Sequence, residues 1–117
     1  MVTPTTREHS LTIRKPYFDL IDRGDKTIEV RVGYPKIRRI AAEDRLRFTS
    51  GEATLLTRVV RVVEYRSFED LLDAEGGAAI GDEALTRAEL LAVIREIYPP
   101  EKEALGVFAI HVGRVTG

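Results

Sequence analysis

The strongest constraint on the fold is the stretch over residues 24–32, in which a turn glycine leads directly into a strand pattern. After Gly24, residues 27–32 alternate between polar and apolar side chains, which is typical of a β-strand with one buried face. We expect a lead-in helix before this strand and a small barrel after it. The apolar side carries Ile28, Val30 and Val32, and the polar side carries Thr27, Glu29 and Arg31.

Further strand and helix patterns follow along the chain. Strands are predicted over residues 10–14, 44–49 and 105–115, and the run 53–65 is long enough for one bent strand or two strands. Residues 36–42 are predicted as a basic connection with one helical turn. Three short helices are predicted: one with Pro16 in its first turn that ends at Gly24, one over residues 68–75, and one over residues 85–98.

Together these patterns predict an α+β fold. Residues 1–8 are polar and lack periodicity, so we expect a flexible tail followed by a single domain over residues 9–117. The sheet should form a small, mostly antiparallel β-barrel of about five to six strands, with about three short helices at its side or mouth.

Composition excludes several classes of site. The chain of 117 residues has no cysteine, so disulfides and thiolate metal sites are excluded. His9 and His111 are its two histidines, and no metal-ligand cluster is visible, so we expect neither a structural metal nor a cofactor. No apolar run approaches the roughly 20 residues of a membrane span, and a cytoplasmic protein is the default expectation.

The charge is unevenly distributed although the net charge is only −1. Residues 23–47 are rich in lysine and arginine, whereas residues 64–89 are rich in aspartate and glutamate. This asymmetry could create a basic face suited to a phosphate-bearing ligand. Alternatively, the two segments pair with each other across the fold.

The pattern Gly24-x-Lys26-x-x-Glu29-x-Arg31 resembles the signature of the ASCH domain, a branch of the PUA-like β-barrels. Asp44 at the start of a later strand and the apolar run 106–110 resemble the family too, so the resemblance covers roughly residues 10–115. It implies a PUA-like barrel with RNA or nucleotide recognition in a cleft beside it.

Some members of this family hydrolyse the amide of N4-acetylcytidine, and at least one resembles a ribonuclease. The amidohydrolase members use a lysine, a threonine and a glutamate. By this resemblance Lys26 matches the lysine and Glu83 the glutamate, but Glu29 stands in the place of the threonine. Thr27 is the nearest hydroxyl and corresponds to a different family position.

The residues themselves favour particular roles. Lys26 would be a partly desolvated base at a barrel mouth, or a surface lysine at a turn. Glu29 could accept from an exocyclic amine and Arg31 could bind phosphate, or the two could form an ordinary ion pair. Lys26 and Glu29 are three residues apart, so they converge only if Lys26 lies in the turn or a bulge intervenes.

Other candidates surround this motif. Of the adjacent Tyr17 and Phe18, one should be in the core and one exposed, and Tyr34 could stack on a base. Arg38 and Arg39 could follow a phosphate backbone. With Gly24, Thr27 and Arg31 of the motif, the residues Tyr34, Arg38 and Arg39 make up the predicted ligand-binding set.

Two functions follow from the sequence, and a third is open. The first is an RNA- or nucleoside-recognising module that has no turnover. The second is a small hydrolase, acting on N4-acylated cytidine or RNA, that uses Lys26 with Glu29 and Glu83. The third is a protein-binding role, for which the sequence indicates no specific partner. No membrane partner is expected.

Overall fold

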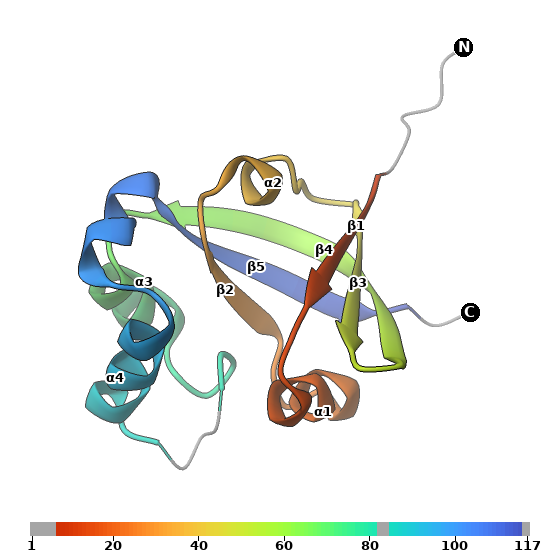
Figure 1. The fold of residues 1–117 in the computed structure, drawn as a ribbon, viewed down its shortest axis with the longest axis horizontal. Helices are drawn as coiled ribbons and strands as arrows, with labels where there is room; N and C mark the ends of the chain where they lie inside the picture. The colour runs from red at the N-terminus through yellow and green to blue at the C-terminus, as the bar shows by residue number, and fades with distance from the viewer. Residues whose placement is uncertain (1–6, 82–84, 116–117) are drawn as a thin grey trace.

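The computed structural model describes residues 7–81 and 85–115, which form one curved sheet with helices around it (Figure 1). Glu83 therefore lies outside the described residues. The strands are β1 (Glu8–Thr12), β2 (Ile28–Val32), β3 (Arg45–Ser50), β4 (Ala53–Tyr65) and β5 (Val107–Arg114). The helices are α1 (Lys15–Arg23), α2 (Pro35–Arg38), α3 (Phe68–Glu75), α4 (Arg87–Ile97) and the 3-10 helix η1 (Pro100–Leu105).

The sheet is a five-stranded, mostly antiparallel half-barrel, which confirms the predicted fold class. Its strand order is β1-β3-β4-β5-β2, so β1 and β2 are the two edges. The pair β1–β3 is parallel and the other three pairs are antiparallel. Because the two edge strands do not pair with each other, the barrel has a seam between β1 and β2.

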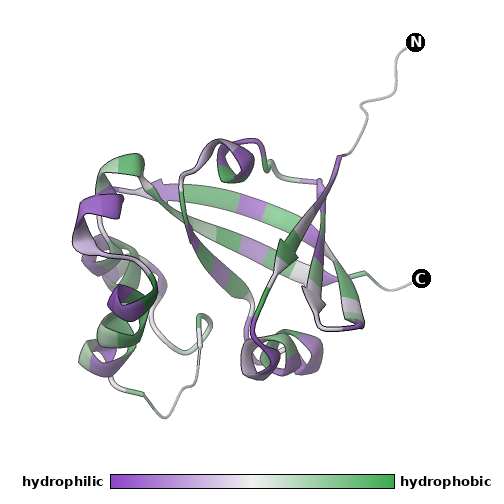
Figure 2. Cartoon of the chain, in the orientation of Figure 1, coloured by the Kyte–Doolittle hydropathy of each residue, from purple (hydrophilic) through white to green (hydrophobic). Residues whose placement is uncertain are grey.

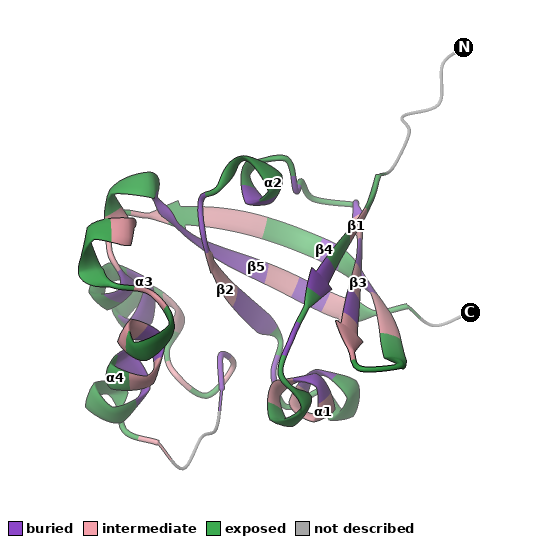
Figure 3. Cartoon of the chain, viewed as in Figure 1, coloured by how far each residue is buried: buried purple, intermediate pink, exposed green. Residues whose placement is uncertain are grey.

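Strand β5 is buried on both sides and separates two apolar clusters. Phe108, Ile110 and Val112 belong to the inner cluster, inside the half-barrel, together with residues from α1 and α2. Val107 and Ala109 belong to the outer cluster, which α3 and α4 cover. Apolar and polar bands alternate along β4 and β5 (Figure 2), and α1, α3 and α4 bury the sides that face the sheet (Figure 3).

Strand β2 follows the predicted alternation. Ile28 and Val32 belong to the outer cluster, with Val30 packed against it. Glu29 and Arg31 are paired with Ile110 and Phe108 of β5, so their side chains lie on the inner face, beside the seam.

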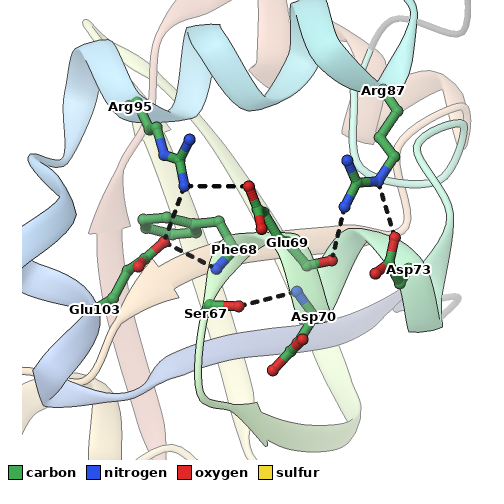
Figure 4. Close-up of polar contacts among 8 residues, drawn as sticks. All are labelled: Ser67, Phe68, Glu69, Asp70, Asp73, Arg87, Arg95 and Glu103. Atoms are coloured by element: carbon green, nitrogen blue, oxygen red, sulfur yellow. Dashed lines mark hydrogen bonds and ion pairs between the residues drawn. The ribbon is translucent and has the colours of Figure 1, made fainter.

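Helices α3 and α4 form the second layer and are linked by polar contacts (Figure 4). Ser67 caps α3 by accepting from the Asp70 amide, and Thr86 with Glu89 forms a capping box on α4. From α4, Arg87 pairs with Asp73 at 2.9 Å, and Arg95 reaches Glu69 of α3 and Glu103 of η1. The layer is thereby fixed as a unit against β5 and β2.

Several boundaries differ from the predicted ones. β1 begins at Glu8, earlier than the predicted residue 10, because it pairs with β3 from the Glu8–Arg45 position onward. β4 is a single strand that bends at a bulge between Val59 and Arg61. The described residues 7–81 and 85–115 contain five helices rather than about three, since the helical turn expected in 36–42 forms as α2 and the Pro-Pro that ends α4 also starts η1.

The basic and acidic segments do not neutralise each other across the fold. Among ion pairs of the described residues, only Arg38–Glu64, at 3.0 Å, joins residues 23–47 to residues 64–89. Some of the other pairs are local, such as Arg23–Asp25, and others join distant residues without linking these two segments, such as Arg47–Glu8. The two histidines lie beside carboxylates that are far away in sequence: His9 Nε2 is 2.8 Å from an Asp44 oxygen, and His111 Nε2 is 2.8 Å from a Glu75 oxygen.

Asp44 holds the start of β1 and the α2–β3 connection together. Its carboxylate accepts from the Arg7 amide at 3.2 Å and the Ala41 amide at 3.1 Å, and it contacts the His9 ring. Burial by itself would raise the pKa of Asp44, but hydrogen bonds from the His9 ring and the two amides outweigh burial and lower the pKa below its ordinary value of 3.8. Asp44 therefore acts as a charged structural residue.

We predict that Asp44→Asn lowers the free energy of unfolding by about 1.5–3 kcal/mol at pH 5, because hydrogen bonds to a charged acceptor are lost. Since the folded-state pKa is lowered, this contribution is present above the unfolded value of 3.8 and is lost as the pH falls through the folded value. Urea unfolding of the wild type and the variant between pH 5 and pH 2 measures the difference in their free energies of unfolding. This difference should become smaller as the pH falls.

Glu43→Gln is the matched control, because Glu43 pairs with Arg58 at 3.1 Å with both side chains exposed. This substitution should change stability by less than about 1 kcal/mol. A wild type–Asp44→Asn difference that stays constant down to pH 2 would contradict the role given to the Asp44 charge.

Candidate functional site

A pocket of about 200 Å³ lies at the seam between β1 and β2. One wall is polar and comes from β2, the turn before it and the end of β1. The opposite wall is apolar and comes from α4, through Leu90, Val93, Ile94 and Ile97. The polar wall contains Thr12, Arg14, Lys26, Glu29 and Arg31.

Helix α1 and its cap place Lys26 at the base of this pocket. Gly24 adopts φ 86° and ends α1, and the Asp25 and Lys26 amides then both donate to the Leu20 carbonyl. Lys26 therefore lies in the turn before β2, not in the strand. This is the arrangement under which Lys26 and Glu29 were expected to converge, and their Nζ and Oε1 atoms are 3.2 Å apart.

The Lys26 ammonium is surrounded by three acceptors. Nζ donates to the Ile28 carbonyl at 2.7 Å and to the Ile80 carbonyl, and it pairs with Glu29. An ammonium has three N–H donors, so every donor of Lys26 has a protein partner. Lys26 thus connects the start of β2 to the segment that precedes α4.

Burial and charge act on Lys26 in opposite directions. The residue is only 4% exposed, and desolvation lowers the pKa of Lys26 below its ordinary value of 10.5, because the opposing effect of the Glu29 carboxylate is smaller. The two backbone carbonyls and the carboxylate all stabilise the charged form. The geometry favours a structural ammonium over a base with a free lone pair.

Glu29 connects the two cations of the motif. Its Oε2 atom accepts from Arg31 Nε at 2.7 Å, while its Oε1 atom faces Lys26. Arg31 also donates from one terminal nitrogen to the Thr12 carbonyl at 2.9 Å, which bridges the seam to β1. Each carboxylate oxygen has a second lone pair and Arg31 has further N–H groups, so both side chains can still bind a ligand.

Two tyrosines frame the site. Tyr17 of α1 lines the pocket, with Lys26 Nζ 5.8 Å from its ring centroid. Phe18 is in the inner core as predicted for one of the pair, but Tyr17 is half-buried rather than exposed, because it packs against the same cluster. Tyr98, at the end of α4, also lines the pocket and stacks on Phe68. Burial raises the pKa of Tyr98, so its hydroxyl stays protonated at neutral pH.

The other predicted ligand-binding residues lie outside this pocket lining. Gly24 and Thr27 border a separate pocket beside α1. Tyr34 is 41% exposed, with Lys102 Nζ 5.6 Å from its ring centroid. Arg38 binds Glu64 and the Gly33 and Leu105 carbonyls, and Arg39 is exposed at the end of α2.

The described residues 7–81 and 85–115 include no group of three or more histidine, aspartate or glutamate side chains arranged to hold a metal ion. Within the same ranges, no helix has the length and apolar character needed to cross a membrane.

A sequence model of the ASCH domain matches residues 11–115 of the chain. This protein belongs to the ASCH domain family. No curated protein matches it. Of the motif that resembles the ASCH signature, Lys26, Glu29 and Arg31 line the polar wall, and Gly24 lies in the turn before β2.

Two solved structures resemble this ASCH domain over nearly their whole length. The hypothetical protein PH0355 is 29% identical, with a TM-score of 0.85, and the match covers 92% of this chain and 99% of the other. Protein PF0455 from Pyrococcus furiosus is 30% identical, with a TM-score of 0.76, and the match covers 94% of this chain and 99% of the other.

Sequence reasoning missed several pocket residues of this ASCH domain. Thr12 is the last residue of β1, Arg14 precedes α1, and Tyr98 follows α4. Only the tertiary structure brings them to the pocket, so their spacing in the sequence does not relate them to it. One signal was available for Tyr98, an aromatic residue directly before Pro99-Pro100, where a helix must end and its last side chain is held in place.

We predict that Lys26→Met lowers the free energy of unfolding by about 3–5 kcal/mol, the usual cost of removing one partner of a buried ion pair. The variant leaves two backbone carbonyls without their donor and Glu29 without one of its two cations. Urea unfolding followed by circular dichroism measures the change.

Arg23→Met is the control from the same turn, because Arg23 pairs with Asp25 while both side chains are more than half exposed. It should cost less than about 1 kcal/mol. A Lys26→Met protein as stable as the Arg23→Met protein would show that Lys26 has no structural role.

Proposed function

We propose that this ASCH domain recognises RNA or a modified nucleoside by holding one base in the seam pocket. The observation that carries the proposal is the Glu29–Arg31 pair, which presents a carboxylate acceptor and guanidinium donors to a pocket with an apolar opposite wall. A base offers matching features, since its edge carries donors and acceptors and its faces are apolar.

The size of the pocket supports a small planar ligand. At about 200 Å³ it lies below the range of roughly 300–1,000 Å³ typical of drug-sized ligands. A single base fits this scale better than a folded peptide or a dinucleotide. The remaining nucleotides of an RNA would lie outside the pocket.

Cations at the pocket are suited to phosphate. Arg14 is exposed and lines the pocket, and Arg31 has a side chain that is 19% exposed. Phosphate contacts position a nucleic acid, whereas contacts to the base edge give specificity. We assign Arg14 to the first role and Glu29 to the second.

The geometry favours recognition over hydrolysis. A lysine base needs a free lone pair, but Lys26 directs all three donors at protein acceptors. Glu29, in the place of the threonine of the amidohydrolase members, is held by Lys26 and Arg31. The hydrolase with Lys26, Glu29 and Glu83 remains the alternative that the binding experiment also tests.

We predict that Glu29→Gln weakens binding of a fluorescent single-stranded RNA at least about tenfold, because a charged acceptor for the base is lost. Arg14→Gln should weaken binding by a similar factor for every RNA sequence, because it removes a phosphate contact. It should also reduce the steepness of log Kobs plotted against log salt concentration by about one. Fluorescence anisotropy over a salt series with RNAs of each base measures both effects.

Arg39→Gln is the control, since Arg39 is exposed and lies outside the pocket lining. It should change the affinity less than Arg14→Gln does. No RNA or nucleoside binding by the folded wild type would refute the proposal. In parallel, release of cytidine from N4-acetylcytidine by the wild type but not by Glu29→Gln would favour the hydrolase instead.

A further inference from the structure

The outer edge of β2 presents a backbone group to the seam pocket. In the β2–β5 pairing, the Val112 amide donates to the Thr27 carbonyl and the Gly33 amide donates to the Gly106 carbonyl, each at 2.9 Å. Antiparallel pairs alternate between bonded and non-bonded positions, so residues 29 and 31, like the Thr27 carbonyl and the Gly33 amide, direct their backbone groups at β5. Residues 28, 30 and 32 therefore direct theirs away from β5, toward the seam.

The protein itself satisfies the two ends of this edge. The Ile28 amide donates to the Ala79 carbonyl at 3.0 Å, and the Ile28 carbonyl accepts from Lys26. At the other end, the Tyr98 hydroxyl faces the Val32 amide, and the Val32 carbonyl accepts from the Tyr34 amide. Both flanking residues thus use their backbone groups within the fold.

Val30 lies between them. Its side chain packs against the outer cluster, and the residue lines the seam pocket. The register directs the Val30 N–H and C=O away from β5, and within residues 7–81 and 85–115 no loop, turn or side-chain group bonds to either of them. A backbone N–H and C=O beside a pocket are strong hydrogen-bonding groups, and a ligand can satisfy both.

We propose that the Val30 backbone N–H and C=O hydrogen-bond the edge of the bound base, so that the base continues the sheet at the seam. This inference rests on the proposed function and names a second group, beside Glu29, that contacts the base edge. The ligand class is a heterocycle with a donor and an acceptor on one edge. Such a base would lie between the Glu29–Arg31 pair and the apolar wall from α4.

The same geometry disfavours an added peptide strand. Strand addition requires several successive edge residues that have open backbone groups. Here Ala79 and Lys26 occupy one side of Val30, and Tyr98 and Tyr34 occupy the other. The edge has one open residue, which matches a single base and the size of the pocket.

Hydrogen exchange of ¹⁵N-labelled protein tests the proposal directly. In the free protein, the Val30 amide should exchange at least about tenfold faster than the Glu29 and Arg31 amides, which lie in the β5 ladder. Saturation with whichever of cytidine, uridine, adenosine or guanosine binds should slow Val30 exchange by about tenfold or more, while Ile110 stays unchanged. A capped trialanine peptide is the comparison ligand.

The outcomes separate this inference from the proposed function. A nucleoside that shifts the Thr12 and Arg14 resonances without slowing Val30 exchange would overturn the inference and leave the proposed function intact. If no nucleoside or RNA binds, both fail. Protection of Val30 by the peptide but not by a nucleoside, or a Val30 amide already as protected as Glu29 in the free protein, would also overturn the inference.

The variant Val30→Pro provides a second test, because it removes the N–H at an edge position where no ladder hydrogen bond is lost. It should weaken nucleoside binding at least about tenfold. Val30→Ala retains the N–H and loses the same side-chain packing, so it should bind within about threefold of the wild type. Equal binding by the two variants, with both folded, would refute a role for the Val30 amide.

Discussion

The buried contact between Lys26 and its three acceptors is the interaction on which the site depends. One ammonium joins the turn after α1, the first residue of β2 and the Ile80 segment before α4. Because Lys26 also faces Glu29, it fixes the carboxylate that Arg31 then ties to β1 through Thr12. The end of β1, the turn with β2, and the Ile80 segment are distant in sequence, and these contacts hold all three around one pocket.

The alternation of polar and apolar side chains along the strands made much of the sheet predictable. The polar and apolar sides of β2 were readable because its apolar face meets the α3–α4 layer while its polar face borders the seam. The bounds of β4 and α3 were predicted as observed, since turn and capping residues mark their ends. The parallel β1–β3 pair could not be read from the sequence, because local periodicity does not specify which strand is the neighbour.

The site was only partly predictable for the same reason. The convergence of Lys26 and Glu29 followed from one local condition, the position of Lys26 in a turn. Arg14, Tyr98 and the α4 wall come from other layers, and no spacing in the sequence relates them to Gly24-x-Lys26-x-x-Glu29-x-Arg31. Arg38 shows the converse, since a basic residue that suggested phosphate binding instead holds β4 and η1 through Glu64 and the Leu105 carbonyl.

The two walls of the pocket belong to different layers, and this division has a consequence for how the site can change. The charged wall is part of the network that stabilises the fold, so substitutions there alter stability together with the polar groups that the pocket presents. The α4 wall contributes Val93 and Ile97, which are only partly buried and lie on a separate helix. Substitutions on the pocket side of α4 can therefore change the shape of the pocket during evolution, while the residues of the charged wall and the fold that they stabilise are conserved.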